Sequence, residues 1–148
     1  MTTDIRGEYT LSDDPARVDA TAVQDYLTQS YWAEGISLDL VKRCIEGSLC
    51  FGVYHASAGQ VGFARVITDR ASFAYLCDVY VLEGHRGRGL SKWMIGAVIS
   101  HADLQGLRRF VLVTKDAHDL YRPFGFTAPA QPDRYMEIAR PGPYTQTS

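Results

Sequence analysis

The stretch DVYVLEGHRGRGLSKWMIGAVI, residues 78–99, decides the fold of this chain. It joins the end of a strand-like run, residues 72–82, to a glycine-rich turn and then to a helical pattern. Apolar side chains between Leu90 and Val98 recur at steps of three and four, which places them on one face of a helix. A strand–helix–strand unit places its two strands parallel, so we expect residues 110–114 to form a strand parallel to residues 72–82.

Three strand-like runs precede this helix, and only short turns separate them. The runs cover residues 49–55, 60–68 and 72–82, and the turns are Ser57-Ala58-Gly59 and Asp69-Arg70-Ala71. Short turns between successive strands favour antiparallel pairing. The middle of the chain therefore predicts an antiparallel meander whose last strand also belongs to the parallel pair.

Helices and two further strands are expected on either side of this meander. They are a strand at 8–11, helices at 13–30 and 37–47, a short helix at 116–121 and a last strand at 134–139. The three helices would begin at Asp13-Asp14-Pro15, Ser37 and Asp116, residues that cap or start helices. The sequence predicts one α/β (α+β) domain over residues 1–148, with its core at about 8–140 and loose termini.

Length and composition agree with one domain and exclude some functions. The chain has 148 residues, of which 46% are hydrophobic and 22% charged, as in ordinary globular proteins. Fifteen Lys and Arg residues stand against 17 Asp and Glu residues, for a formal net charge of −2. This balance excludes a nucleic-acid binder that works through bulk positive charge.

The cysteines and the N-terminus bear on metal sites and on location. Cys44, Cys50 and Cys77 are widely spaced and show no zinc-ligand pattern, so we expect reduced thiols and no metal. The N-terminal residues lack an apolar core of the signal-peptide kind, and no run approaches the ~20 apolar residues of a membrane span. We therefore expect a cytoplasmic protein with no membrane partner.

The glycine-rich turn is the strongest chemical feature. It stands before a helix start, where backbone N–H groups are free and glycines allow a ligand to approach closely. Arg86, Arg88 and Lys92 add positive charge, so the turn is typical of a phosphate site. Neither the P-loop nor the dinucleotide-binding spacing is present. A tight turn with solvated arginines is the alternative interpretation.

Two motifs carry a resemblance to a known family. RGRGLS, residues 86–91, follows the strand DVYV, residues 78–81, and resembles motif A of the GCN5-related N-acetyltransferases (GNAT). TKDAHDLYRPFGF, residues 114–126, resembles the motif B of that family. The motifs occur in the family's order, and the order of elements fits from about residue 8 to residue 140.

The resemblance implies a fold and a cofactor site. It implies a central mixed, mostly antiparallel sheet with helices on both faces, and a splayed parallel strand pair that forms an acetyl-CoA cleft. The implied contacts are backbone groups of Val79 and Val81 for the pantetheine arm and amides of Arg86, Gly87, Arg88, Gly89, Leu90 and Ser91 for the pyrophosphate.

The resemblance further implies direct transfer of an acetyl group from acetyl-CoA to a primary amine. Tyr121 is then the acid that protonates the leaving thiolate. Asp78 is the candidate general base, because a carboxylate within an apolar strand needs a use or a partner. An ion pair with Arg65 is the alternative for Asp78. Cys77 as an acyl-enzyme nucleophile is a further alternative, although no partner residue has the required spacing.

The acceptor site is expected near the connection between the first two helices. Trp32 and Glu34 offer an aromatic wall and an anion for a cationic amine, and Tyr75 is a third candidate. An aromatic lid packed on the core is the alternative. The acceptor would be a small molecule or a peptide, and the family resemblance allows a homodimer. A non-catalytic acetyl-CoA- or CoA-binding sensor or interaction module remains the second hypothesis for function.

Overall fold

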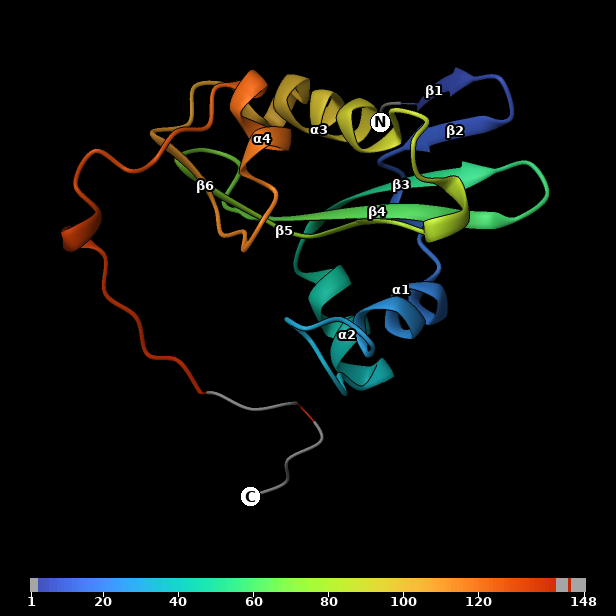
Figure 1. Ribbon diagram of the computed structural model, residues 1–148, viewed down its shortest axis with the longest axis horizontal. Coiled ribbons are helices and arrows are strands. Elements are labelled where there is room, and N and C mark those ends of the chain that lie inside the picture. Colours follow the sequence, from blue (N-terminus) through green and yellow to red (C-terminus); the bar gives the residue numbers. More distant parts are fainter. Residues whose placement is uncertain (1–2, 141–143, 145–148) are drawn as a thin grey trace.

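The computed structural model describes residues 3–140 and 144, and its core is one six-stranded sheet (Figure 1). The strands lie side by side in sequence order: β1 (Thr3–Arg6), β2 (Tyr9–Ser12), β3 (Leu49–His55), β4 (Gly59–Thr68), β5 (Phe73–Val81) and β6 (Arg109–Leu112). Neighbouring strands are antiparallel except β5 and β6, which are parallel. The predicted meander and the predicted parallel pair are both confirmed.

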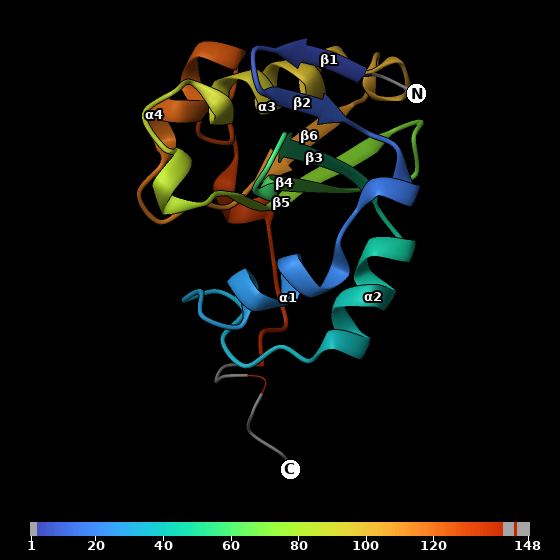
Figure 2. The same cartoon turned by 90° about the vertical axis from the view of Figure 1, so that its right-hand side faces the viewer.

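The helices lie on both faces of the sheet, as expected. Figures 1 and 2 show α1 (Ala20–Leu27) and α2 (Leu38–Glu46) on one face and α3 (Leu90–Ser100) and α4 (His118–Tyr121) on the other. Side-chain caps fix two of the starts, because Asp19 accepts from the Ala22 amide and Ser37 from the Leu40 amide. The first helix is shorter than expected, since residues 15–17 form a separate 3₁₀ turn before it.

Each face of the sheet has its own hydrophobic core. Phe51 is fully buried in the core under α3 and α4, and Phe63 is fully buried in the core under α1 and α2. The predicted apolar face of α3 contributes Leu90, Trp93 and Val98 to the first core. Because both faces are covered, β3 and β4 are buried along nearly continuous runs instead of alternating with solvent.

The parallel pair separates half-way along β5. Its register runs from Phe73 opposite Arg109 to Leu76 opposite Leu112, where β6 ends while β5 continues. Just beyond this point, the pairing of β4 with β5 shifts, so that two residues of β5 face Ala64 alone. The first of the two, Asp78, has φ of 53°, a left-handed conformation that fits a β-bulge. The splayed strand pair implied by the resemblance is therefore present.

The two ends of the chain differ from the expectation. Residues 3–6, expected to be loose, form β1 because a turn at Gly7 (φ 57°) folds them onto β2. The Trp93 indole also donates to Asp4 Oδ2 at 2.9 Å, which holds β1 against α3.

The strand expected at 134–139 was wrong. Its residues are exposed and only the 3₁₀ turn Pro132–Arg134 is regular there, because no other described strand lies beside them. The cap expected at Asp116 was also wrong, since Thr114 Oγ1 accepts from the Ala117 amide before α4. Within residues 3–140, no helix is long and apolar enough to cross a bilayer.

Candidate active site

A pocket of about 360 Å³ opens where β5 and β6 part. Its walls come from β5, the chain that follows β6, the loop after α1 and the end of α4. Five of the sequence-predicted site residues line it, namely Trp32, Tyr75, Asp78, Val79 and Tyr121. The separation of two parallel strands therefore creates the cavity, and residues far apart in the sequence meet there.

Tyr121 stands on one wall of this pocket and is 7% exposed. It is the last residue of the one-turn helix α4, and its ring meets Phe126 edge-on at 6.0 Å between centroids. Burial raises the pKa of Tyr121 to about 12, and the nearby Tyr31 adds to the rise. The phenol therefore remains protonated at any physiological pH, and it can donate a hydrogen bond into the pocket.

Asp78 stands on the β5 wall and is held on both carboxylate oxygens. Arg65 Nε donates to Oδ2 at 2.8 Å, and the indole Nε1 of Trp32 donates to Oδ1 at 2.9 Å. The side chain of Asp78 is 10% exposed and that of Arg65 is 14% exposed, so this is a largely buried ion pair. Arg65 also donates to Ser48 Oγ at 3.1 Å. The Arg65 pair, one of the two interpretations of Asp78, is thus present.

Cys77 also lines the pocket, but its thiol is not activated. Burial raises the pKa of Cys77 to about 12, although the positive charge of Arg65 acts in the opposite direction. A thiol with this pKa is almost entirely protonated at neutral pH, and the thiolate is the nucleophilic form. The structure therefore gives no support to an acyl-enzyme at Cys77.

The wall of the pocket formed by the loop after α1 is aromatic. Tyr31 and Trp32 project from the loop after α1, with their rings edge-on at 5.1 Å between centroids, and the Lys115 ammonium lies over the Tyr31 ring. Glu34 lies outside the pocket lining and is exposed, and its backbone carbonyl accepts from the Tyr144 amide at 2.8 Å. Tyr31 belongs to the connection expected to build this site, although only Trp32 and Glu34 of that connection were named as candidates.

The glycine-rich turn leads into α3 without a side-chain cap. Gly87 and Gly89 have φ of 80° and 76°, and a Cβ at either would meet open space. Gly89 is the N-cap of α3, with no side-chain hydrogen bond to the first turn, in which Leu90 is buried and Ser91 half-buried. The backbone amides there are free of side-chain competition and lie at the positive end of the helix dipole. Such a turn can bind an anion.

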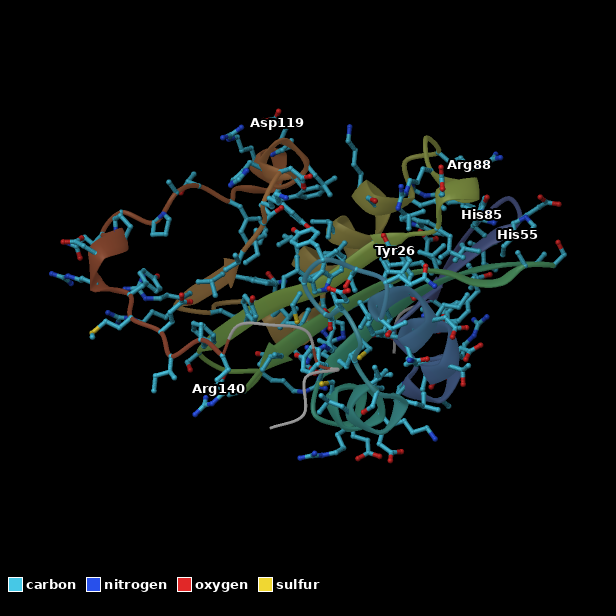
Figure 3. All side chains as sticks on the ribbon, turned by 60° about the horizontal axis from the view of Figure 1, so that its bottom comes forward. Tyr26, His55, His85, Arg88, Asp119 and Arg140 are labelled. Atoms are coloured by element: carbon cyan, nitrogen blue, oxygen red, sulfur yellow. The ribbon has the colours of Figure 1, made fainter. Side chains whose placement is uncertain are left out.

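The arginines of this turn do different things. Arg86 is exposed but tied to neighbouring elements, since Nε donates to the Val81 carbonyl at 2.9 Å and Nη2 to the Tyr26 hydroxyl at 3.1 Å. Arg88 and Lys92 are exposed, and Figure 3 shows Arg88 at the outer side of the turn. Arg88 and Lys92 thus offer side-chain charge to a phosphate, and Arg86 ties the turn to β5 and α1.

Comparison with known proteins gives the family. The profile of the "Acetyltransferase (GNAT) family" matches residues 19–126, most of the chain. This chain belongs to the GNAT family. A curated relative from Gibberella zeae, provisionally named an acetyltransferase, is 34% identical over 78% of this chain and 77% of its own. A crystal structure of a GNAT-family protein from Xanthomonas campestris is 50% identical and superposes with a TM-score of 0.90, covering 95% of this chain and 99% of its own.

More distant structures share the GNAT fold alone. A Clostridium acetobutylicum protein, crystallised with acetyl-CoA, has a TM-score of 0.63 at 15% identity, covering 88% of this chain and 94% of its own. The relatives are acetyltransferases by name, and this GNAT protein is an acyltransferase. The family uses acetyl-CoA. Within residues 3–140 and 144, the structure holds no group of three or more metal-ligating side chains.

Proposed function

We propose that this GNAT protein is an acetyl-CoA-dependent N-acetyltransferase that moves the acetyl group directly to a primary amine. One observation carries the proposal: a single pocket between the parting strands has the protonated Tyr121 on one wall and the Asp78 carboxylate on another. Proton donor and proton acceptor thus face the same cavity, as acyl transfer to an amine requires.

The residues at the pocket and the turn fit acetyl-CoA. The open space at Gly87 and Gly89 and the uncapped start of α3 suit a pyrophosphate, with Arg88 and Lys92 as its cationic neighbours. Val79 lines the pocket beyond the end of β6, where a chain-like pantetheine arm could take the place of a paired strand. When bound, acetyl-CoA supplies the activated acetyl group as a thioester.

Tyr121 stabilises the thiolate that leaves the thioester. Its pKa of about 12 lies some three to four units above that of an ordinary thiol, about 8.5. Complete proton transfer to the sulfur would therefore be uphill by about 5 kcal/mol. Tyr121 acts by donating a hydrogen bond to the sulfur, which charge makes stronger than a neutral one. The proton that the amine loses balances the charge on the thiolate.

Asp78 receives the attacking amine. Arg65 and Trp32 each donate one hydrogen bond to a different carboxylate oxygen of Asp78. Each oxygen keeps a lone pair that can accept from an N–H of the amine or from a water molecule that bridges Asp78 and the amine. Because both oxygens already accept a hydrogen bond, Asp78 orients the amine through these remaining lone pairs, and the proton of the amine passes through water to solvent. Tyr75 and Trp32 form the aromatic wall against which an organic amine would lie.

Thiol release tests this function. Purified protein is mixed with acetyl-CoA and a panel of polyamines, aminoglycosides, amino acids and peptides with free N-termini, and free CoA is measured against a no-amine control. We expect amine-dependent thiol release and an acetylated product by mass spectrometry. If acetyl-CoA binds by calorimetry while no amine releases thiol, the chain is a sensor and the proposal fails.

A further inference from the structure

The walls of the catalytic pocket balance their own charges. Among the described residues that line it, the carboxylates are Asp78 and Asp116 and the cation is Lys115. Asp78 is paired with Arg65, whose Nε lies 2.8 Å from Oδ2. Lys115 and Asp116 are both exposed and carry opposite charges. The pocket together with Arg65 therefore presents no net charge to an acceptor.

A substrate with several amines would find too few carboxylates in this pocket. Polyamines and aminoglycosides carry several ammonium groups at neutral pH, and each one that leaves water needs a partner. Glu34, expected from the sequence as an anion of this site, lies outside the pocket lining. Asp116 is the one lining carboxylate without a described ion pair, and Lys115 beside it in the sequence opposes its charge. The charges therefore favour an acceptor with a single amine.

Aromatic and aliphatic side chains make up most of the remaining lining. Trp32 lies beside the carboxylate that receives the amine, because its indole donates to Asp78 Oδ1 at 2.9 Å. Tyr75 stands three residues before Asp78 on β5 and lines the same pocket. Two apolar side chains of the lining also reach solvent, since Trp32 is 40% exposed and Val113 is 82% exposed. An exposed apolar surface on the wall of a cavity is typical of a site for an apolar ligand.

A cation of the protein itself already occupies part of this aromatic surface. The Lys115 ammonium lies 5.3 Å from the centroid of the Tyr31 ring, and Tyr31 meets Trp32 edge-on. Lys115 would repel a second ammonium that approached the same rings. Among the described residues, no cation lies over the ring of Trp32 or Tyr75. These two rings are therefore left for an uncharged part of the acceptor.

We propose that the acceptor is a primary monoamine with an aromatic body. The ring of the acceptor lies against Tyr75 and Trp32, its amine reaches Asp78, and Lys115 excludes a second ammonium. This substrate class rests on the N-acetyltransferase function proposed above and narrows its acceptor. Tyr75 tests it most directly, because no described hydrogen bond joins Tyr75 to Asp78 or Arg65.

Matched amines test the substrate class. Hexylamine and hexamethylenediamine differ by one amine, and phenethylamine replaces part of the hexyl chain with a ring. With kcat/KM expressed per concentration of uncharged amine, we expect hexylamine to exceed hexamethylenediamine by about fivefold or more, because a second ammonium loses water without gaining a partner. We expect phenethylamine to exceed hexylamine by about 2- to 12-fold, which is the additional value of an aromatic pair.

The outcomes separate this inference from the function on which it rests. Equal kcat/KM for the three amines, or the highest value for hexamethylenediamine, spermidine or kanamycin, would overturn the substrate class and leave the acetyltransferase function standing. Thiol release from no amine would refute the function itself. Calorimetry with the CoA-bound protein, which cannot transfer an acetyl group, would still rank the amines, and we expect phenethylamine to bind most tightly.

Substitution of Tyr75 identifies the wall that holds the ring. Tyr75→Leu should raise KM for phenethylamine by about 2- to 12-fold, with kcat and the KM for hexylamine within about twofold. Tyr75→Phe keeps the ring and should restore the low KM for phenethylamine. Phe73→Leu is the matched control, since Phe73 lies two residues earlier on β5, exposed and outside the pocket lining. No rise in KM with Tyr75→Leu, or an equal rise for both amines, would overturn the proposal.

The charge of Lys115 is tested in the same assay. Lys115→Glu should lower the kcat/KM ratio of hexylamine to hexamethylenediamine by about threefold or more, because an acidic side chain attracts the second ammonium. Lys42→Glu makes the same charge change at an exposed residue of α2 outside the pocket lining, and should leave this ratio unchanged. A ratio insensitive to Lys115→Glu, or equally sensitive to both substitutions, would overturn the role of Lys115.

Discussion

Replacing Tyr121 with Phe removes one hydroxyl and leaves the ring. The ring contact with Phe126 survives, and Tyr121 lines the open pocket, so the fold should lose little stability. What is lost is a hydrogen bond to a developing thiolate, worth about 1.5–3 kcal/mol when one partner is charged. This converts to a fall in kcat of about 10- to 150-fold.

The assay is thiol release at saturating amine, with acetyl-CoA affinity measured by calorimetry on the same preparations. We expect kcat to fall and the acetyl-CoA dissociation constant to stay within about twofold, because the uncapped start of α3 and Arg88 are untouched. Tyr31→Phe is the matched control, since it removes a phenol from the same pocket without removing the proposed donor. If kcat of Tyr121→Phe equals that of the wild type, Tyr121 has no part in the departure of the thiol.

Three further predictions follow from the site. Asn is compatible with the left-handed backbone at position 78, so Asp78→Asn should not strain the chain. The substitution leaves Arg65 without its ion pair, and we expect the free energy of unfolding in urea titrations to fall by about 3–5 kcal/mol. We also expect kcat/KM to fall. Unchanged kcat/KM would remove Asp78 from the reaction. Arg88→Ala should weaken acetyl-CoA binding in calorimetry, most at low salt, whereas Arg86→Ala should lower the melting temperature because its bonds are internal. If Arg88→Ala and Arg86→Ala had equal effects on acetyl-CoA affinity and on melting temperature, the two arginines would not have these separate roles. We expect kcat/KM to rise as the pH approaches the pKa of the amine. Because the pKa of Tyr121 is about 12, its deprotonation should not lower kcat/KM below about pH 11. A fall in kcat/KM near pH 9 would contradict this raised pKa.

The sequence predicted the features that local pattern controls. Strand β5, the glycine-rich turn and α3 follow one another within 30 residues, and their periodicities and glycines are enough to place them. The parallel position of β6 followed from connectivity alone. Tyr121 was found through the resemblance, and the structure places it against the predicted cleft.

Features that depend on contacts between residues far apart in the chain could not be predicted from the sequence. β1 is polar, and its place rests on Trp93, 89 residues away from Asp4. The hydrogen bond from Arg86 to the Tyr26 hydroxyl joins the turn to α1 across 60 residues of sequence. The strand expected at 134–139 was wrong because strand propensity says nothing about the presence of a neighbour.

The short parallel ladder between β5 and β6 has a consequence for stability. Only four residue pairs join β6, the strand that leads to α4 and Tyr121, to the rest of the sheet, and of the described strands only β1 is joined by as few. Such regions open locally before the whole protein unfolds, and amide hydrogen exchange reports that opening. A ligand that contacts both separated strands must oppose the opening, by about 2.7 kcal/mol at 100 times its dissociation constant. Acetyl-CoA should therefore slow amide exchange at residues 109–112. The size of this slowing would measure how strongly the bound cofactor holds β6 and β5 together.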